Sequence, residues 1–239
     1  MNKSDLVIAT ITLARNLPEE TLLRESLTLL STLDIPVFVT DGGSGPEFLA
    51  FLQSLPNFTL LQAEAKGVWA QAKNSLRDAQ ATGVPFILYT EPDKKDFFQN
   101  HLPEFIANAS IGKAVGVILA SRSAAGFNTF PAFQRTTETT INQCINEVTS
   151  QTGDYTYGPF LFNRELGSYL DLVKEDIGWG WRPYLFGLAH RLEFSLTHLN
   201  GNYTCPPDQQ EDNSSERLYR MRQMVQNIQG LLLSTSINI

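Results

Sequence analysis

The first 90 residues alternate between short apolar runs and longer amphipathic segments, and this alternation constrains the fold more than any other feature. The apolar runs, many of them β-branched, predict buried strands over 6–13, 35–40, 58–62 and 85–90. The segments between them predict helices over 18–33, 47–55 and 68–81. Strands and helices that alternate with short connections favour a mostly parallel sheet with helices on both faces.

The second half of the chain is less regular. The residue pattern predicts helices over 97–109, 136–149, 183–192 and 216–233, and strands over 114–120 and 192–199. The stretch 155–163 combines glycine, proline and aromatic residues and is interpreted as the wall of a pocket. Because no repeat and no interdomain linker is visible, we predict one α/β domain over 1–239.

Acidic side chains follow the fourth predicted strand directly. Glu91 and Asp93 lie one residue apart, and Pro92 between them fixes the backbone φ angle. Side chains alternate along an extended backbone, so the two carboxylates point the same way. Ligands of open parallel sheets bind outside the carboxyl ends of the strands. Carboxylate oxygens there suit Mg²⁺ or Mn²⁺ carrying a diphosphate, and the alternative is a solvated acidic turn.

Composition and charge bound the class of protein. The chain has 239 residues, of which 42% are hydrophobic, and a formal net charge of −7, which argues against a nucleic-acid partner. Cys144 and Cys205 are far apart and are expected to be reduced thiols. No stretch approaches the roughly 20 apolar residues of a membrane span, and the amino terminus lacks the apolar core of a signal peptide. We therefore expect a soluble, cytoplasmic protein.

Several short motifs, in this order, resemble those of the family-two-type glycosyltransferases with the GT-A fold. The matching segments are 39–44 (VTDGGS, for V-D-D-G-S), 66–74 (for N-x-G-…-A-R-N), 91–93 (for D-x-D) and 174–180 (KEDIGWG, for E-D and G-W-G). The resemblance covers residues 5 to about 200. It implies a single Rossmann-like GT-A domain, with a nucleotide-sugar half over 5–110, an acceptor half over 111–200 and a terminal loop and helix over 201–239.

Two positions depart from the family motifs. Gly42 stands where the family has the second aspartate of its pair, and Glu91 replaces the first aspartate of D-x-D. The Q-x-x-R-W motif of processive polysaccharide synthases is absent from the sequence. A glutamate still binds a metal, but its longer side chain moves the ion, so donor choice and metal affinity stay open.

The resemblance implies a nucleotide-sugar site made of residues from the strand ends and the loops after them. These residues are Thr12, Leu13, Arg15, Asp41, Lys66 and Glu91. Asp41 would accept a hydrogen bond from a base N–H or from the ribose; its alternative is a turn-forming aspartate before glycine. Lys66, with the amino terminus of the next helix, would meet the base or the diphosphate; its alternative is a solvated loop lysine.

The resemblance also implies a divalent metal and a catalytic base. Asp93, Glu91 and His198 would hold Mg²⁺ or Mn²⁺, which stabilises charge on the departing nucleoside diphosphate. Glu175 and Asp176 stand where inverting members keep the general base, and their alternative is an acidic helix start. A retaining enzyme would not need that base, so the stereochemistry stays open.

The sequence therefore predicts a hexosyltransferase that uses a nucleoside-diphosphate sugar donor and a small-molecule or lipid-linked acceptor. The 121–123 loop is a candidate for acceptor recognition, because Arg122 could bind a carboxylate or phosphate in bidentate fashion. Two alternatives are a nucleotidyltransferase, whose glycine-rich basic loop is not found at 13–20, and a non-catalytic module that binds nucleotide or sugar. Apolar residues at helical spacing in 216–233 pack on the same domain or allow self-association.

Overall fold

The structure, a computed structural model, describes residues 1–238, which form two compact units. The first unit comprises residues 1–111 and 159–168, so a short segment from the middle of the chain completes it. The second unit comprises 112–158 and the residues from 169 onward. The boundary near residue 111 lies beside the predicted limit between the two halves, while the organisation as a single domain stays a prediction.

The first unit is built on a mostly parallel sheet. Its strands are β1 (Leu6–Thr12), β2 (Val37–Asp41), β3 (Phe58–Gln62), β4 (Phe86–Tyr89) and β6 (Phe160–Asn163), in the order β3-β2-β1-β4-β6. The first four run parallel, and β6 runs antiparallel to β4. The register pairs Thr12 with Asp41, so β1 and β2 end side by side. Every residue of β1 and β4 is buried, as expected for strands covered on both faces.

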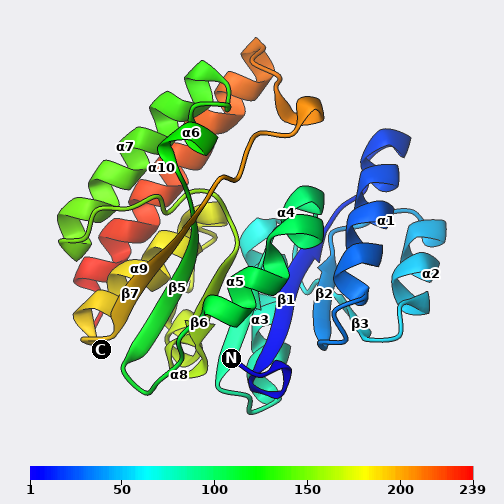
Figure 1. The fold of residues 1–239 in the computed structure, drawn as a ribbon, viewed down its shortest axis with the longest axis horizontal. Helices are drawn as coiled ribbons and strands as arrows, with labels where there is room; N and C mark the ends of the chain where they lie inside the picture. Colours follow the sequence, from blue (N-terminus) through cyan, green and yellow to red (C-terminus); the bar gives the residue numbers. More distant parts are fainter. Residues whose placement is uncertain (239) are drawn as a thin grey trace. The chain divides into compact units, whose positions relative to one another are not determined.

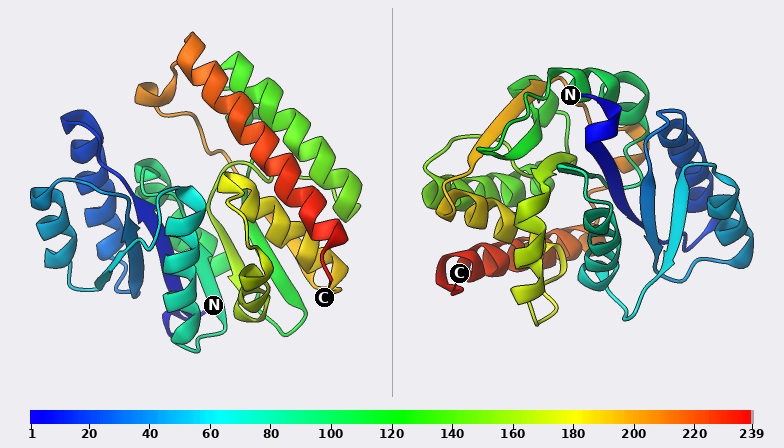
Figure 2. Two further views of the ribbon diagram at one scale, coloured as in Figure 1. Left: turned by 180° about the vertical axis from the view of Figure 1, so that it is seen from behind. Right: turned by 90° about the horizontal axis from the view of Figure 1, so that it is seen from below.

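Helices cover both faces of this sheet. They are α1 (Leu17–Ser31), α2 (Pro46–Ser54), α3 (Val68–Ala81), α4 (Lys95–Asn100), α5 (Leu102–Asn108) and α8 (Arg164–Gly167), after the short 3₁₀ helix η1 (Lys3–Asp5). Helices α1, α4 and α5 lie on one face of the sheet and α3 on the other (Figures 1 and 2). Asn16 caps α1 by accepting a hydrogen bond from the Glu19 N–H, and Pro18 fits its first turn.

The second unit pairs two parallel strands with a layer of long helices. Its elements are β5 (Val115–Arg122), α6 (Ala124–Phe127), α7 (Ala132–Thr149), η3 (Gly178–Gly180), α9 (Trp181–Arg191), β7 (Ser195–Gly201), η4 (Pro207–Gln209) and α10 (Ser214–Ser236). The 3₁₀ helix η2 (Ser168–Leu172) leads into its second segment. Strand β5 pairs with β7, and α7, α9 and α10 lie side by side (Figures 1 and 2). In residues 1–238, no helix has the length and apolar character to cross a membrane.

The α/β class with a mostly parallel sheet is confirmed, while one predicted helix is wrong and one strand is missed. The single helix predicted over 97–109 is two helices, because the chain turns at His101 and Pro103 starts α5. The sequence pattern of the stretch 155–163 does not indicate a strand, yet its last four residues form the fully buried strand β6. An apolar run of three residues before Asn163 is too short to show its partner strand in the sequence alone.

Candidate functional site

The polar residues of the first unit gather where β1, β2 and β4 end. These strands are neighbours and run parallel, so their carboxyl ends meet at one edge of the sheet. The segments that leave this edge are 13–16, 42–45 and 90–94. Helix α3 begins at the same edge, because it follows the end of β3. This edge is the position at which open parallel sheets bind ligands.

The carboxylate of Asp41 organises the turn after β2. Its Oδ1 accepts hydrogen bonds from the N–H groups of Gly43 (2.8 Å) and Ser44 (2.7 Å). Its Oδ2 accepts from the hydroxyls of Thr12 (2.9 Å) and Ser44 (2.6 Å). Asp41 is only 8% exposed, and a carboxylate has about four lone-pair positions in all. Its acceptor capacity is therefore committed to the turn, in line with the structural alternative for this residue.

The same network fixes the loop after β1 against the turn after β2. The carbonyl of Thr12 accepts a hydrogen bond from the Gly42 N–H (2.8 Å), and the Ser44 hydroxyl accepts one from the Ala14 N–H (2.8 Å). Leu13 is exposed beside them. The Arg15 side chain is 71% exposed and pairs with Glu19 at 3.1 Å on α1. Of the residues predicted in this loop, the structure thus ties Thr12 to Asp41 and leaves Leu13 and Arg15 at the surface.

Gln71 joins this network from α3, although sequence reasoning did not single it out. Its Nε2 donates to the carbonyl of Thr12 (2.9 Å) and, at longer range, to that of Thr40 (3.4 Å). Gln71 is 6% exposed. A Cβ on Gly42 would lie 2.6 Å from Nε2, so the amide of Gln71 occupies the space that a side chain at position 42 would need.

A polar stripe on α3 is the signal that could have found Gln71. Gln71, Asn74 and Ser75 lie at helical spacing on a face that otherwise buries apolar side chains. Asn74 donates to the carbonyl of Gln62 (2.9 Å), and Ser75 donates to that of Thr10 (2.8 Å). The asparagine of the motif-like segment 66–74 therefore holds strand ends in place. Lys66 lies exposed in the loop that precedes α3.

Glu91 and Asp93 lie in the turn between β4 and α4, and both are partly buried. The Asp93 carbonyl accepts a hydrogen bond from the Lys95 N–H (2.9 Å), which closes the turn. Two carboxylates from one short turn form a hard-oxygen donor set that fits Mg²⁺ or Mn²⁺. Over residues 1–238, no group of three or more His, Cys, Asp or Glu side chains is arranged to hold a metal ion. Such an ion would take its remaining ligands from water or from a diphosphate, as Mg²⁺ commonly does.

His198 lies on β7 in the second unit and contacts Ser121 and Tyr155. The Ser121 hydroxyl donates to the Asp154 carbonyl (2.8 Å), so it accepts from His198 Nδ1 at 2.7 Å, which places a proton on Nδ1. The ring packs edge-to-face on Tyr155, with 4.6 Å between ring centroids. Burial lowers the pKa of His198, and the nearby Asp154 opposes this shift. The neutral ring leaves Nε2 without a proton, which is the form in which a histidine binds metals.

Glu175 and Asp176 are exposed in the segment just before η3. Asp176 Oδ1 accepts a hydrogen bond from the Gly178 N–H (2.9 Å), which forms a local turn. The glycines of this segment are explained by packing, since a Cβ on Gly180 would collide with the main chain of α10 at Gln226. The structure thus presents both carboxylates on the surface of the second unit.

Arg122, the sequence candidate for acceptor recognition, is buried in β5 at 5% exposure. Its guanidinium pairs with Asp154 (2.7 Å) and Glu138 (2.7 Å) and stacks on the rings of Phe127 and Phe130. Burial alone would raise the pKa of Asp154, but the guanidinium holds that pKa well below its usual range. Both ends of the guanidinium fork are occupied, so Arg122 stabilises the second unit.

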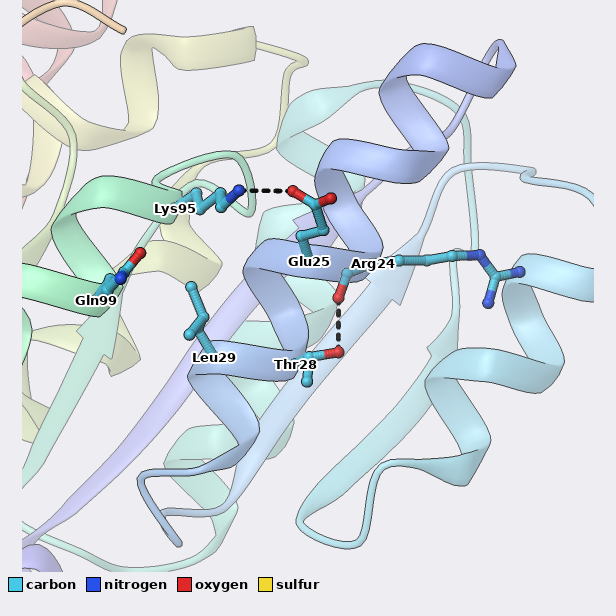
Figure 3. Close-up of a pocket in the computed structure, with 6 residues that line it drawn as sticks. All are labelled: Arg24, Glu25, Thr28, Leu29, Lys95 and Gln99. Carbon is cyan, nitrogen blue, oxygen red and sulfur yellow. Dashed lines mark hydrogen bonds and ion pairs between the residues drawn. The ribbon is translucent and has the colours of Figure 1, made fainter.

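A separate groove of about 400 Å³ lies between α1 and α4 (Figure 3). It is lined by Arg24, Glu25, Thr28, Leu29, Lys95 and Gln99. The Lys95 ammonium and the Glu25 carboxylate form an ion pair at 2.6 Å across it. The groove contains none of the predicted site residues, and it is lined by helix side chains rather than by strand ends.

The comparisons with known proteins support the fold. No protein-family model and no curated protein sequence matches this chain. Crystal structures of glucosyl-3-phosphoglycerate synthase from Mycobacterium tuberculosis do match over 98% of this chain and 80–81% of theirs. The complex with Mn²⁺, UDP-glucose and phosphoglyceric acid has 15% identity and a TM-score of 0.64. The complex with UDP has 15% identity and a TM-score of 0.66. The complex with Mg²⁺ and UDP has 14% identity and a TM-score of 0.62.

These matches show that the chain has the GT-A fold expected from its motifs. At 14–16% sequence identity these matches establish the fold alone. The activity has to be argued from the residues at the strand ends.

Proposed function

We propose that this protein is a glycosyltransferase that moves a hexose from a nucleoside-diphosphate sugar to a hydroxyl group of an acceptor. The observation that carries the proposal is the position of Glu91 and Asp93, which follow β4 at the edge where β1 and β2 also end. The matching synthase structures contain UDP or UDP-glucose with Mn²⁺ or Mg²⁺. UDP-glucose is therefore the first donor to test.

The donor would bind to the first unit. Glu91 and Asp93 would hold Mg²⁺ or Mn²⁺, which when bound offsets the charge of the diphosphate leaving group. Lys66 and the amino terminus of α3 supply positive potential on the same edge of the sheet. The preformed loops 12–15 and 41–44 would hold the nucleoside without reorganising, because their hydrogen bonds are already made.

The acceptor would be activated by a residue of the second unit. Asp176 is the first candidate for the general base, because the Gly178 N–H fixes one of its oxygens and so orients the carboxylate. Glu175 is the second candidate. His198, expected from the family resemblance as a third metal ligand, lies in the second unit, and within residues 1–238 it belongs to no group of three side chains arranged to hold a metal ion. We propose a small acceptor such as the phosphoglyceric acid of the matching structures, with a lipid-linked acceptor as the alternative.

Thermal stabilisation by nucleotides tests the donor site. UDP, GDP, ADP and dTDP and their sugar conjugates would be added with and without Mn²⁺, because a ligand of the folded state raises its stability. We expect a shift for one nucleotide that requires Mn²⁺ and is lost in Asp93→Asn. Asp96→Asn is the matched control, since Asp96 is exposed, accepts a hydrogen bond from the Asn100 amide and lies 3.6 Å from the His101 ring nitrogen, away from the strand ends. The absence of any shift would remove the donor site.

A second candidate function is a non-catalytic module that binds a nucleotide or a sugar. Gly42 and Glu91, which replace two family aspartates, favour it. Binding without Mn²⁺ and without turnover would support this alternative. For the setting of either function we propose the cytoplasm, where Cys144 and Cys205, which form no disulfide, would stay reduced.

A further inference from the structure

We propose that Gln71 reads the nucleobase at this site, by accepting a hydrogen bond from the ring N–H of uracil on its side-chain oxygen Oε1. The inference deepens the proposed function and rests on it, with UDP as the nucleotide. It names a specificity-determining residue that lies on α3, outside the motifs that mark the fold.

The first argument is the fixed orientation of the amide. Nε2 donates to the carbonyls of Thr12 (2.9 Å) and Thr40 (3.4 Å), and an oxygen in that position would face two other oxygens. The contacts thus decide which end of the amide is nitrogen. Oε1 is left as an acceptor, because the side-chain hydrogen bonds of Gln71 to described residues run only from Nε2. The side chain is 94% buried, so this acceptor is held rather than mobile.

The second argument is the position of this oxygen. Oε1 lies 3.2 Å from the point that a Cβ on Gly42 would occupy, and Gly42 is exposed at the end of β2. The φ angle of Gly42 lies outside the left-handed region, whereas that of Gly43 is +118°. Backbone conformation therefore does not require glycine at position 42. The glycine there makes room for the amide of Gln71, so the two residues form a matched pair.

The third argument is that neighbouring acceptors are already used. The Asp41 carboxylate accepts four hydrogen bonds. The Ser44 hydroxyl donates to Asp41 and accepts from the Ala14 N–H. The Thr12 carbonyl accepts from both Gly42 and Gln71. Oε1 of Gln71 is a side-chain acceptor of this network that keeps its full capacity for a ligand N–H, whereas the Thr12 hydroxyl already donates to Asp41 and keeps only part of its capacity.

A neutral amide suits this task chemically. The imide N–H of uracil is a hydrogen-bond donor. A hydrogen bond between a neutral donor and a neutral, preoriented acceptor carries only a small free-energy cost of desolvation and ordering. A carboxylate at the same place would add negative charge close to a diphosphate, and it could not donate to the carbonyls of Thr12 and Thr40. The pair of Gly42 and Gln71 thus offers an uncharged acceptor at this position.

Affinity measurements by calorimetry in the presence of Mn²⁺ test this inference, with UDP, N3-methyl-UDP and inorganic pyrophosphate as ligands. We expect Gln71→Leu to weaken UDP binding by about 5- to 10-fold, the effect of one hydrogen bond, and to leave pyrophosphate binding unchanged. Wild type should prefer UDP over N3-methyl-UDP, and Gln71→Leu should lose that preference. Ser75→Ala is the matched control, because it removes two buried hydrogen bonds, to Thr10 and Thr40, from the same face of α3 without removing Oε1.

Each other outcome overturns a specific statement. If Gln71→Leu binds UDP as wild type does, or keeps the preference over N3-methyl-UDP, the inference is wrong while the donor site stands. An equal loss for UDP and pyrophosphate would show that Gln71 only supports the loops. If wild type binds pyrophosphate but not UDP, uracil recognition is wrong. If wild type binds neither, the proposed function itself fails.

Discussion

Replacing Asp41 with alanine should destabilise the whole strand-end network rather than remove one ligand contact. The carboxylate accepts four hydrogen bonds, two of them from the buried hydroxyls of Thr12 and Ser44. Each buried donor left without a partner costs about 1–3 kcal/mol, so these two contribute roughly 2–6 kcal/mol. The N–H of Gly43 lies in an exposed turn and can bond to water, which limits the added cost.

This free energy converts into a measurable change in melting temperature. For a chain of this size about 1 kcal/mol corresponds to 2–4 °C, so we expect Asp41→Ala to melt roughly 4–24 °C below wild type. Differential scanning fluorimetry and urea unfolding without ligand would measure it. Asp41→Asn should lose less, because its single oxygen can still accept from the N–H groups of the turn. An unchanged melting temperature combined with lost nucleotide binding would refute the reasoning and make Asp41 a ligand contact.

Two further predictions concern the second unit. Gly230→Ala should destabilise the second unit, because a Cβ at position 230 would collide with the carbonyl of Gly180. Urea unfolding of this variant should show a lower midpoint than wild type. An unchanged midpoint would contradict this close packing of α10 on η3. Arg122 lowers the pKa of Asp154, so the stabilisation from this carboxylate is complete above its unfolded pKa of about 3.9 and is lost as the pH falls below that value. Wild type should therefore lose stability more steeply below about pH 4 than Asp154→Asn does; equal pH slopes would contradict this prediction.

Much of the first unit could be predicted from the sequence because its elements are marked by local pattern. Strand β3 and helix α3 begin and end at the predicted residues, since apolar periodicity and glycine or proline delimit both. The position of Glu91 after β4 also follows from sequence, because the parallel arrangement brings strand ends to one edge. The buried strand β6 could not be predicted, since it is defined by its antiparallel pairing with β4, about 70 residues away.

The site was harder to predict because single residues have more than one use. Asp41 matched a family motif, but only the structure shows that four donors of its own turn surround it. Arg122 lies after an apolar run and resembles a ligand-binding loop residue, yet it is the buried partner of two carboxylates. Gln71 depends on carbonyl groups 31 and 59 residues away, which no local pattern can show.

The most direct test of the central claim is release of UDP from UDP-glucose over a prolonged incubation, measured with Mn²⁺ and with phosphoglyceric acid or water as the acceptor. We expect release that depends on Mn²⁺, is faster with a suitable hydroxyl acceptor, and is abolished in Asp93→Asn while Asp96→Asn retains it. Tight Mn²⁺-independent UDP binding, with no release above the rate of buffer alone, would contradict the claim and identify a non-catalytic nucleotide-binding protein.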